Sequence, residues 1–203
     1  MTMKALGYAV GHAINSATLT WRHHGIGCLQ AYLHEGQDET RVHIWHPALV
    51  IPGFDITNGL AHSHRFAFQS YVLLGEIWNE EITLTVDPTG KWVLHNVTPA
   101  RDAMREEGTY NKPLGVANDE LYSATRDGQW YRAGERYEFE LRKFHLSLTK
   151  ELAVTLVVKG ELDDEPAQIL ARRGTPLIHA FEGAKSAAEY VHIIAEASLR
   201  LTL

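Results

Sequence analysis

Apolar and polar residues alternate along much of the middle of the chain. Phe66, Phe68 and Ser70 occupy every second position of a run that ends at Gly75, and residues 81–86 alternate in the same way. Successive side chains of a β-strand point to opposite faces, so this period predicts strands. The turn-forming residues 87–90 (Asp-Pro-Thr-Gly) follow, and we expect the next segment, KWVLHNV, to pair back as the second arm of a hairpin.

Further strands are predicted on both sides of this region. Residues 41–53 are rich in β-branched and aromatic side chains and contain two prolines, which favours two strands with a bend. The segments GERYEFELRKFHLSL and ELAVTLVVKG again have strand character. The pattern is lost between residues 101 and 128, so we interpret that stretch as an insertion or lid with one or two helical turns.

Two helices are expected outside the strands. The run CLQAYLHEG suits a short helix ending near Gly36. Ser186 and Glu189 have the spacing of a capping box, and apolar residues then recur at helical intervals up to Leu201. We therefore predict a single domain over residues 1–203: a mainly β barrel core at 41–160, an N-terminal extension with a helical preamble at 1–40, and a C-terminal extension at 161–203 whose helix packs on the barrel or on a second subunit.

Composition excludes several partners. The net charge is −6 and the basic residues are scattered, so we expect no nucleic-acid partner. No apolar run reaches the 18 or more residues of a membrane-spanning helix, so no membrane partner is expected. The single cysteine, Cys28, forms no internal disulfide, which favours a cytoplasmic location. The chain is 45% hydrophobic, enough to build a core, so a metal would serve chemistry rather than folding.

The sequence His62-Ser63-His64 is the strongest chemical signal among the 12 histidines. Residues two apart in a strand point to the same side, so the two imidazoles are expected at chelating distance. A divalent ion needs at least one further ligand, and a third histidine serves as well as a carboxylate. His145 lies in a later strand-like segment and is our candidate. We expect one metal ion per chain.

The residues around the pair resemble the first signature of the cupin superfamily. Gly59 precedes the pair, and the strand YVLLG follows it; a second signature is matched by His145 ahead of the apolar strand AVTLVV. The resemblance covers about residues 41–160 and implies a double-stranded β-helix, or jelly roll.

Within that superfamily the chain looks most like the three-histidine branch of the cysteine dioxygenases. The usual cupin glutamate is replaced by Phe68 and Gln69, and Gln69 is a weak fourth ligand candidate. The resemblance implies Fe(II), although zinc, nickel and manganese also suit three histidines. It also implies an arginine that holds the substrate, for which Arg41 is the candidate. Cys28 precedes the barrel segment, so the Cys–Tyr crosslink of that branch is not expected.

Other residues receive weaker assignments. Tyr71 and Tyr137 are candidates for hydrogen bonds to a bound oxygen species, and His95 for a place in the cavity wall. We expect His43 and His46 to face opposite sides of a strand, each in a packing or surface role, and the adjacent pair His23 and His24 to be solvated.

Three functions remain open. The first is a mononuclear metal-dependent dioxygenase that acts on a small organic substrate. The second is a non-catalytic cupin that binds a metal or a small molecule. The third is a metal-free sugar epimerase or isomerase, which would need a histidine base oriented by a carboxylate. By analogy with jelly rolls that pair their exposed edges, we expect a homodimer.

Overall fold

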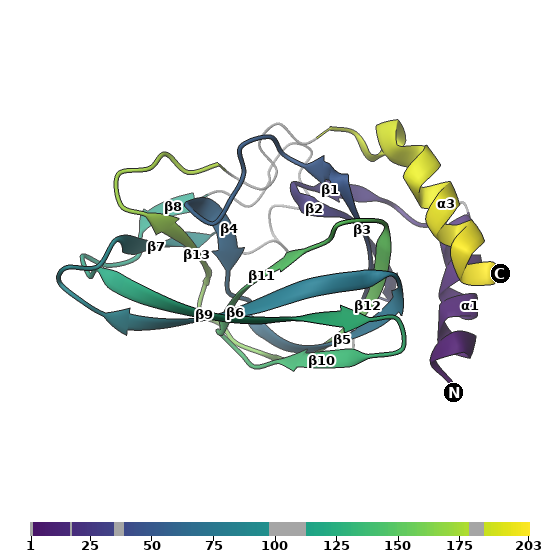
Figure 1. Ribbon diagram of the computed structural model, residues 1–203, viewed down its shortest axis with the longest axis horizontal. Coiled ribbons are helices and arrows are strands. Elements are labelled where there is room, and N and C mark those ends of the chain that lie inside the picture. Colours follow the sequence, from purple (N-terminus) through teal and green to yellow (C-terminus); the bar gives the residue numbers. More distant parts are fainter. Residues whose placement is uncertain (1, 17, 35–38, 98–112, 179–184) are drawn as a thin grey trace.

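The computed structural model describes residues 2–16, 18–34, 39–97, 113–178 and 185–203. The strands of this part of the chain form two antiparallel sheets that face each other, with helices outside one of them (Figure 1). The prediction of a mainly β jelly-roll arrangement with a helix near each end is confirmed.

The first sheet contains six of the described strands and is built from both halves of the chain. Its order is β1 (Arg22–His24), β2 (Ile26–His34), β3 (Thr40–Val50), β12 (Ala153–Leu162), β5 (Phe66–Leu74) and β10 (Arg136–Phe139). The late strand β12 thus lies between two early strands, in register with Val42 of β3 and Tyr71 of β5 through its residue Leu156.

The second sheet contains seven of the described strands. Its order is β13 (Ala167–Arg172), β4 (Asn58–His62), β11 (Phe144–Leu148), β6 (Glu76–Val86), β9 (Tyr122–Arg132), β7 (Trp92–Val97) and β8 (Pro113–Val116). Strand β13 also pairs with β7, so the sheet closes on itself.

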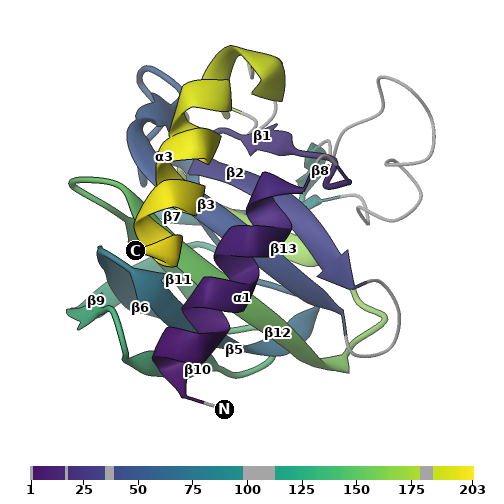
Figure 2. The same cartoon turned by 90° about the vertical axis from the view of Figure 1, so that its right-hand side faces the viewer.

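Both helices cover the outer face of the first sheet (Figure 2). Helix α1 (Met3–Asn15) and helix α3 (Val191–Thr202) contact each other, and α3 follows a 3-10 turn (Ala187–Tyr190) that Ser186 caps as predicted. Apolar residues of both helices, such as Val10 and Ile193, bury the outer face of the strands. Among the described helices, none has the length and apolar character needed to cross a membrane.

Two predictions about the first sheet are wrong. Residues 26–34, expected to be part of a helical preamble, form β2, and the two strands expected at 41–53 are one long strand, β3. The alternation in β2 was concealed because both of its faces are buried. Leu29 and Ala31 lie beneath the helices, while Cys28 and Gln30 face the second sheet. The sheets therefore extend beyond residues 41–160.

The predicted hairpin is also wrong. The turn at Asp87 forms, but β6 does not pair with β7. Instead β9 pairs with the whole of β6, from Glu76 opposite Arg132 to Val86 opposite Tyr122, an uninterrupted ladder that a six-residue strand cannot supply. Much of the stretch expected as a lid is therefore strand. The helical turns expected near residues 101–108 lie outside the described residues.

The contact between α1 and α3 depends on a glycine. A Cβ atom at Gly11 would lie 2.9 Å from the Leu201 Cβ and 2.9 Å from the Thr202 Cγ2, whereas one at Gly7 would lie 3.6 Å from its nearest neighbour, the Leu201 Cδ2. We expect Gly11→Ala to lower the free energy of unfolding by about 1–2 kcal/mol, because overpacking outweighs the better helix propensity of alanine.

The matched control is Gly7→Ala, which gains helix propensity without a clash and is expected to be neutral or stabilising. Urea unfolding of both variants measures the difference. Equal stability of the two variants would contradict the proposed close approach of the helices.

Candidate metal centre

Two of the three predicted ligands come from neighbouring strands of the second sheet. His62 is the last residue of β4, and His145 lies directly opposite it in β11. With His64, these side chains place one ring nitrogen each within 4.8 Å of one another. The sequence prediction that His145 joins the pair is therefore supported by the geometry.

His64 reaches the cluster in a different way from the one expected. The strand ends at His62, so His64 belongs to the following loop, yet its Nε2 lies 2.9 Å from the His145 Nε2. This loop is held on both sides. The Ser63 N–H donates to the Gln168 carbonyl at 2.8 Å, and the Arg142 N–H donates to the His64 carbonyl at 3.3 Å.

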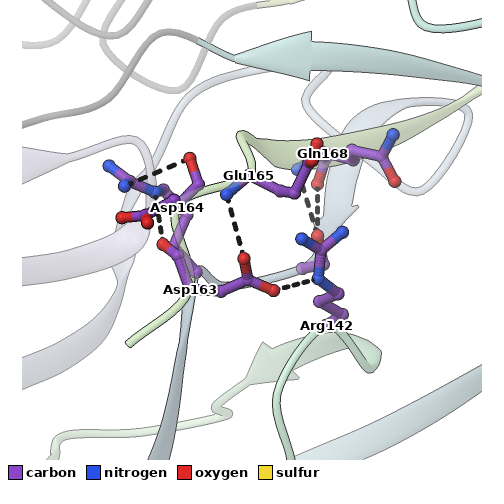
Figure 3. A network of polar contacts seen from close by, with 7 residues as sticks. Arg142, Asp163, Asp164, Glu165 and Gln168 are labelled. Atoms are coloured by element: carbon purple, nitrogen blue, oxygen red, sulfur yellow. Dashed lines mark hydrogen bonds and ion pairs between the residues drawn. The ribbon is translucent and has the colours of Figure 1, made fainter. Parts of the chain in front are cut away.

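An ion pair stabilises the loop contact (Figure 3). The Arg142 side chain donates to the Asp163 carboxylate, which also accepts a hydrogen bond from the Glu165 N–H at 3.0 Å. These contacts, the Arg142 hydrogen bond first among them, lower the pKa of Asp163 to about 2. Arg142 has a positive φ of 62°, a conformation that costs a non-glycine residue free energy and that persists where surrounding contacts fix it.

Hydrogen bonds fix the orientation of two of the imidazoles. The His62 Nδ1 donates to the Leu60 carbonyl at 2.9 Å, and the His145 Nδ1 donates to the Asn79 Oδ1 at 2.9 Å. Asn79 is buried and also accepts a hydrogen bond from the Ser147 hydroxyl at 3.0 Å. With the proton on Nδ1, each ring presents the lone pair of Nε2, which is the form that binds a metal.

The protonation state also suits a divalent ion. Burial lowers the pKa of His62, and it lowers the pKa values of His64 and His145 well below the usual range, with the neighbouring histidines adding to the effect. Three neutral imidazoles result. Nitrogens bound to one ion at 2.0–2.1 Å lie about 3 Å apart, close to the 2.9 Å between His64 and His145. The residues present therefore fit a metal with three histidine ligands.

The three histidines form one wall of a cavity with a volume of about 70 Å³ between the two sheets. Aromatic rings surround them: Phe139 lies 4.5 Å from the His145 ring, and Phe66 lies 4.9 Å from the His64 ring. Strands of the first sheet supply the opposite wall through Gln30, His43 and Arg41. The site is thus a small, mostly apolar chamber with a few polar groups, as ligand sites in proteins usually are.

Two weaker candidates lie away from the cluster. Gln69 and Tyr71 belong to β5, whose cavity-lining residues are Phe66 and Phe68, so both point to the outer face. There the Tyr71 hydroxyl donates to the Gln69 Oε1 at 2.7 Å. The expectations of a fourth ligand at Gln69 and of an oxygen-binding hydroxyl at Tyr71 are corrected by this placement.

The other three candidates differ in whether they line the cavity. Tyr137 lines the cavity, and burial raises its pKa, so its phenol stays protonated. Arg41 also lines the cavity and forms an ion pair with the buried Glu39. His95 lies in β7 opposite Ile169 and is not among the described residues that line this cavity.

Sequence reasoning missed several cavity residues. The pair His23 and His24 was expected to be solvated, but His24 lines the cavity and His23 is buried. His43 was expected in a packing or surface role, and Cys28 was placed before the barrel, yet both line the cavity, as does Gln30. Burial raises the pKa of the Cys28 thiol and keeps it protonated. The available signal was the period of two in residues 28–32, which was interpreted as a helix.

The hydrogen bond from His145 to Asn79 predicts a measurable effect. We expect Asn79→Ala to weaken zinc binding roughly 10- to 100-fold. Without the hydrogen bond to Asn79, the His145 ring would lose its fixed tautomer and orientation. Asn79→Asp keeps an acceptor at this position and is expected to retain binding. Competition with a chromophoric chelator measures both affinities.

The exposed Asn118→Ala serves as the matched control and is expected to bind zinc like the parent protein. If Asn79→Ala bound zinc as tightly as this control, Asn79 would have no part in the metal centre.

Comparison with known proteins gives only distant likenesses. No family model matches the chain, and no curated protein matches it. Among solved structures, CapF from Staphylococcus aureus is 13% identical with a TM-score of 0.31, and the match covers 73% of this chain and 32% of that one. The CENP-C cupin domain of Drosophila melanogaster is 12% identical with a TM-score of 0.32, covering 70% and 76%. The chain spans about a third of CapF. Such distant likenesses support no argument, so the description of the fold rests on the sheet topology.

Proposed function

We propose that this chain is a mononuclear metal-dependent dioxygenase that acts on a small organic substrate in the cavity between the sheets. The observation that supports the proposal is the convergence of His62, His64 and His145, each neutral, on one point of the cavity wall. Iron(II) is the proposed metal, held by these three residues. When bound, it would supply a Lewis acid with open positions for substrate and dioxygen side by side.

The chain's own residues contribute positioning and exclusion of water. Phe68 and Phe139 stack at 5.6 Å next to the His145 ring and keep that side of the site apolar. Tyr137 presents a protonated phenol to the cavity. We further propose that Arg41 contacts an anionic group of the substrate, although its pairing with Glu39 already compensates part of its charge.

The metal-free epimerase or isomerase is less well supported. That chemistry needs a histidine base oriented by a carboxylate. In the cluster, His62 is oriented by the Leu60 carbonyl and His145 by the Asn79 amide. Neither partner is a carboxylate, and the convergence of three imidazoles would have no purpose in such an enzyme.

The proposal is tested by metal analysis followed by oxygen uptake. The purified protein is loaded anaerobically with iron(II), and in parallel with zinc, nickel or manganese, and each form is supplied with a panel of thiols, diketones and catechols. We expect about one metal ion per chain and oxygen consumption with at least one substrate class in the iron form only.

The control is the same protein with His145→Ala, which should consume no oxygen above the background of free iron. Bound iron without oxygen uptake on any substrate class would instead favour the non-catalytic metal-binding or small-molecule-binding cupin.

A further inference from the structure

A buried amide faces the metal centre from the opposite wall of the cavity. Gln30 is 5% exposed, and its side chain lines the cavity. Its amide borders the open space of the cavity and is not among the fully buried, unpartnered atoms of the described residues. An amide in this position offers its donors and its acceptor to whatever occupies the cavity, so the side chain is expected to bind a molecule there.

A histidine lies beside this amide. His43 in β3 is the register partner of Gln30 in β2 and lines the same cavity. Its Nδ1 is buried and has no hydrogen-bond partner among the residues that the structure describes. Leaving a donor unsatisfied costs more than leaving a lone pair unsatisfied, so the proton is placed on Nε2, the other ring nitrogen of this cavity-lining side chain.

We propose that Gln30 and His43 form a ligand-binding subsite that receives a carboxyl-type group, in acid or amide form, from a small molecule bound at the metal centre. The Gln30 amide and the His43 Nε2–H both offer donors to an oxygen with sp² geometry, and the Gln30 oxygen accepts from an amide. This subsite deepens the proposed function, since it rests on a substrate in the same cavity.

The surroundings match such a ligand. The subsite is polar, whereas other residues that line the same cavity include the aromatic side chains Trp45 and Phe68. A ligand with one polar end and a short apolar body would satisfy both regions. Arg41 also lines the cavity, and its positive charge would favour a ligand carboxylate over an amide. Its ion pair with Glu39 reduces that preference.

The test follows the Gln30 side chain directly. The zinc-loaded and the metal-free protein, labelled with ¹⁵N, are titrated with propionate and with propionamide, which have the same shape and differ in charge. The side-chain NH₂ signal of Gln30 is assigned by its loss in Gln30→Met. We expect it to shift saturably with at least one probe, and the preferred probe identifies the acid or amide form.

Affinity is then compared between variants from the backbone signals. Gln30→Met keeps the volume and removes both hydrogen-bonding atoms, so its Kd is expected to rise roughly tenfold. His43→Phe should act in the same direction, and the exposed Gln129→Met is the matched control with an unchanged Kd.

Two results would overturn the subsite. One is an unmoved Gln30 signal with both probes, which would mean that the amide is hydrated by water alone. The other is an unchanged Kd in Gln30→Met. Zinc content is measured on every sample, so a failed metal centre is recognised separately: binding to the metal-free protein tests the subsite even if no metal is retained.

Discussion

Replacing His145 with alanine is expected to remove tight metal binding while leaving the protein folded. Binding energies of zinc sites correspond to about 3 kcal/mol per ligand, so the affinity should fall by roughly 100-fold or more. His62→Ala and His64→Ala should have the same effect, because the three side chains converge on one point. Elemental analysis after dialysis measures the metal content of each variant.

A histidine away from the site provides the matched control. His192 is exposed on α3, and His192→Ala should retain the metal content of the parent protein. Circular dichroism of each variant shows whether the fold persists. Unchanged metal content in all three variants of the cluster would refute the site, even if the protein binds metal elsewhere.

The metal-free protein is expected to lose several kcal/mol of stability between pH 6.5 and pH 3. Burial, with Arg41 nearby, lowers the pKa of His43 to about 3, so the folded state resists a proton that the unfolded state takes up near pH 6.5. The free energy of unfolding therefore has its full value above pH 6.5 and decreases as the pH falls below 6.5. The decrease due to His43 amounts to at most about 5 kcal/mol. The lowered pKa values of the three histidines in the cluster act in the same direction.

Urea unfolding of the metal-free protein at a series of pH values measures this dependence. The variant His43→Gln carries no titrating group at this position and should show a shallower decline. His12→Gln, which changes an exposed histidine on α1, should decline like the parent protein. Equal stability at pH 8 and pH 4 would show that the buried histidines take up protons freely in the folded state.

The chemical core of the site could be predicted from sequence, because local spacing carries the signal. Two histidines two residues apart need only an extended backbone to share a face, and His145 stands in a segment with clear strand character. The loop at His64 was not predicted. Its position depends on Arg142 and Asp163, which are far from it in sequence and contact it only after folding.

The opposite wall could not be predicted because hydrophobic patterning fails in a sheet that is buried on both faces. In β2 the residues beneath the helices are apolar, and those that face the cavity include Cys28, which is also apolar. Within this run of β2, Gln30 is the strongly polar residue that interrupts the apolar side chains. The role of Asn79 depends on the register between β6 and β11, which pairs it with Ser147.

Strand β12 has a consequence for the order in which the protein can fold during synthesis. Strands β3 and β5 emerge from the ribosome early, but their common partner is complete only once residue 162 has been made. Until then each exposes an unpaired edge to solvent and to other chains. His145 follows His64 by 81 residues, so the nascent chain holds only two of the three ligands while those residues are made. Metal capture is therefore expected to follow closure of the first sheet.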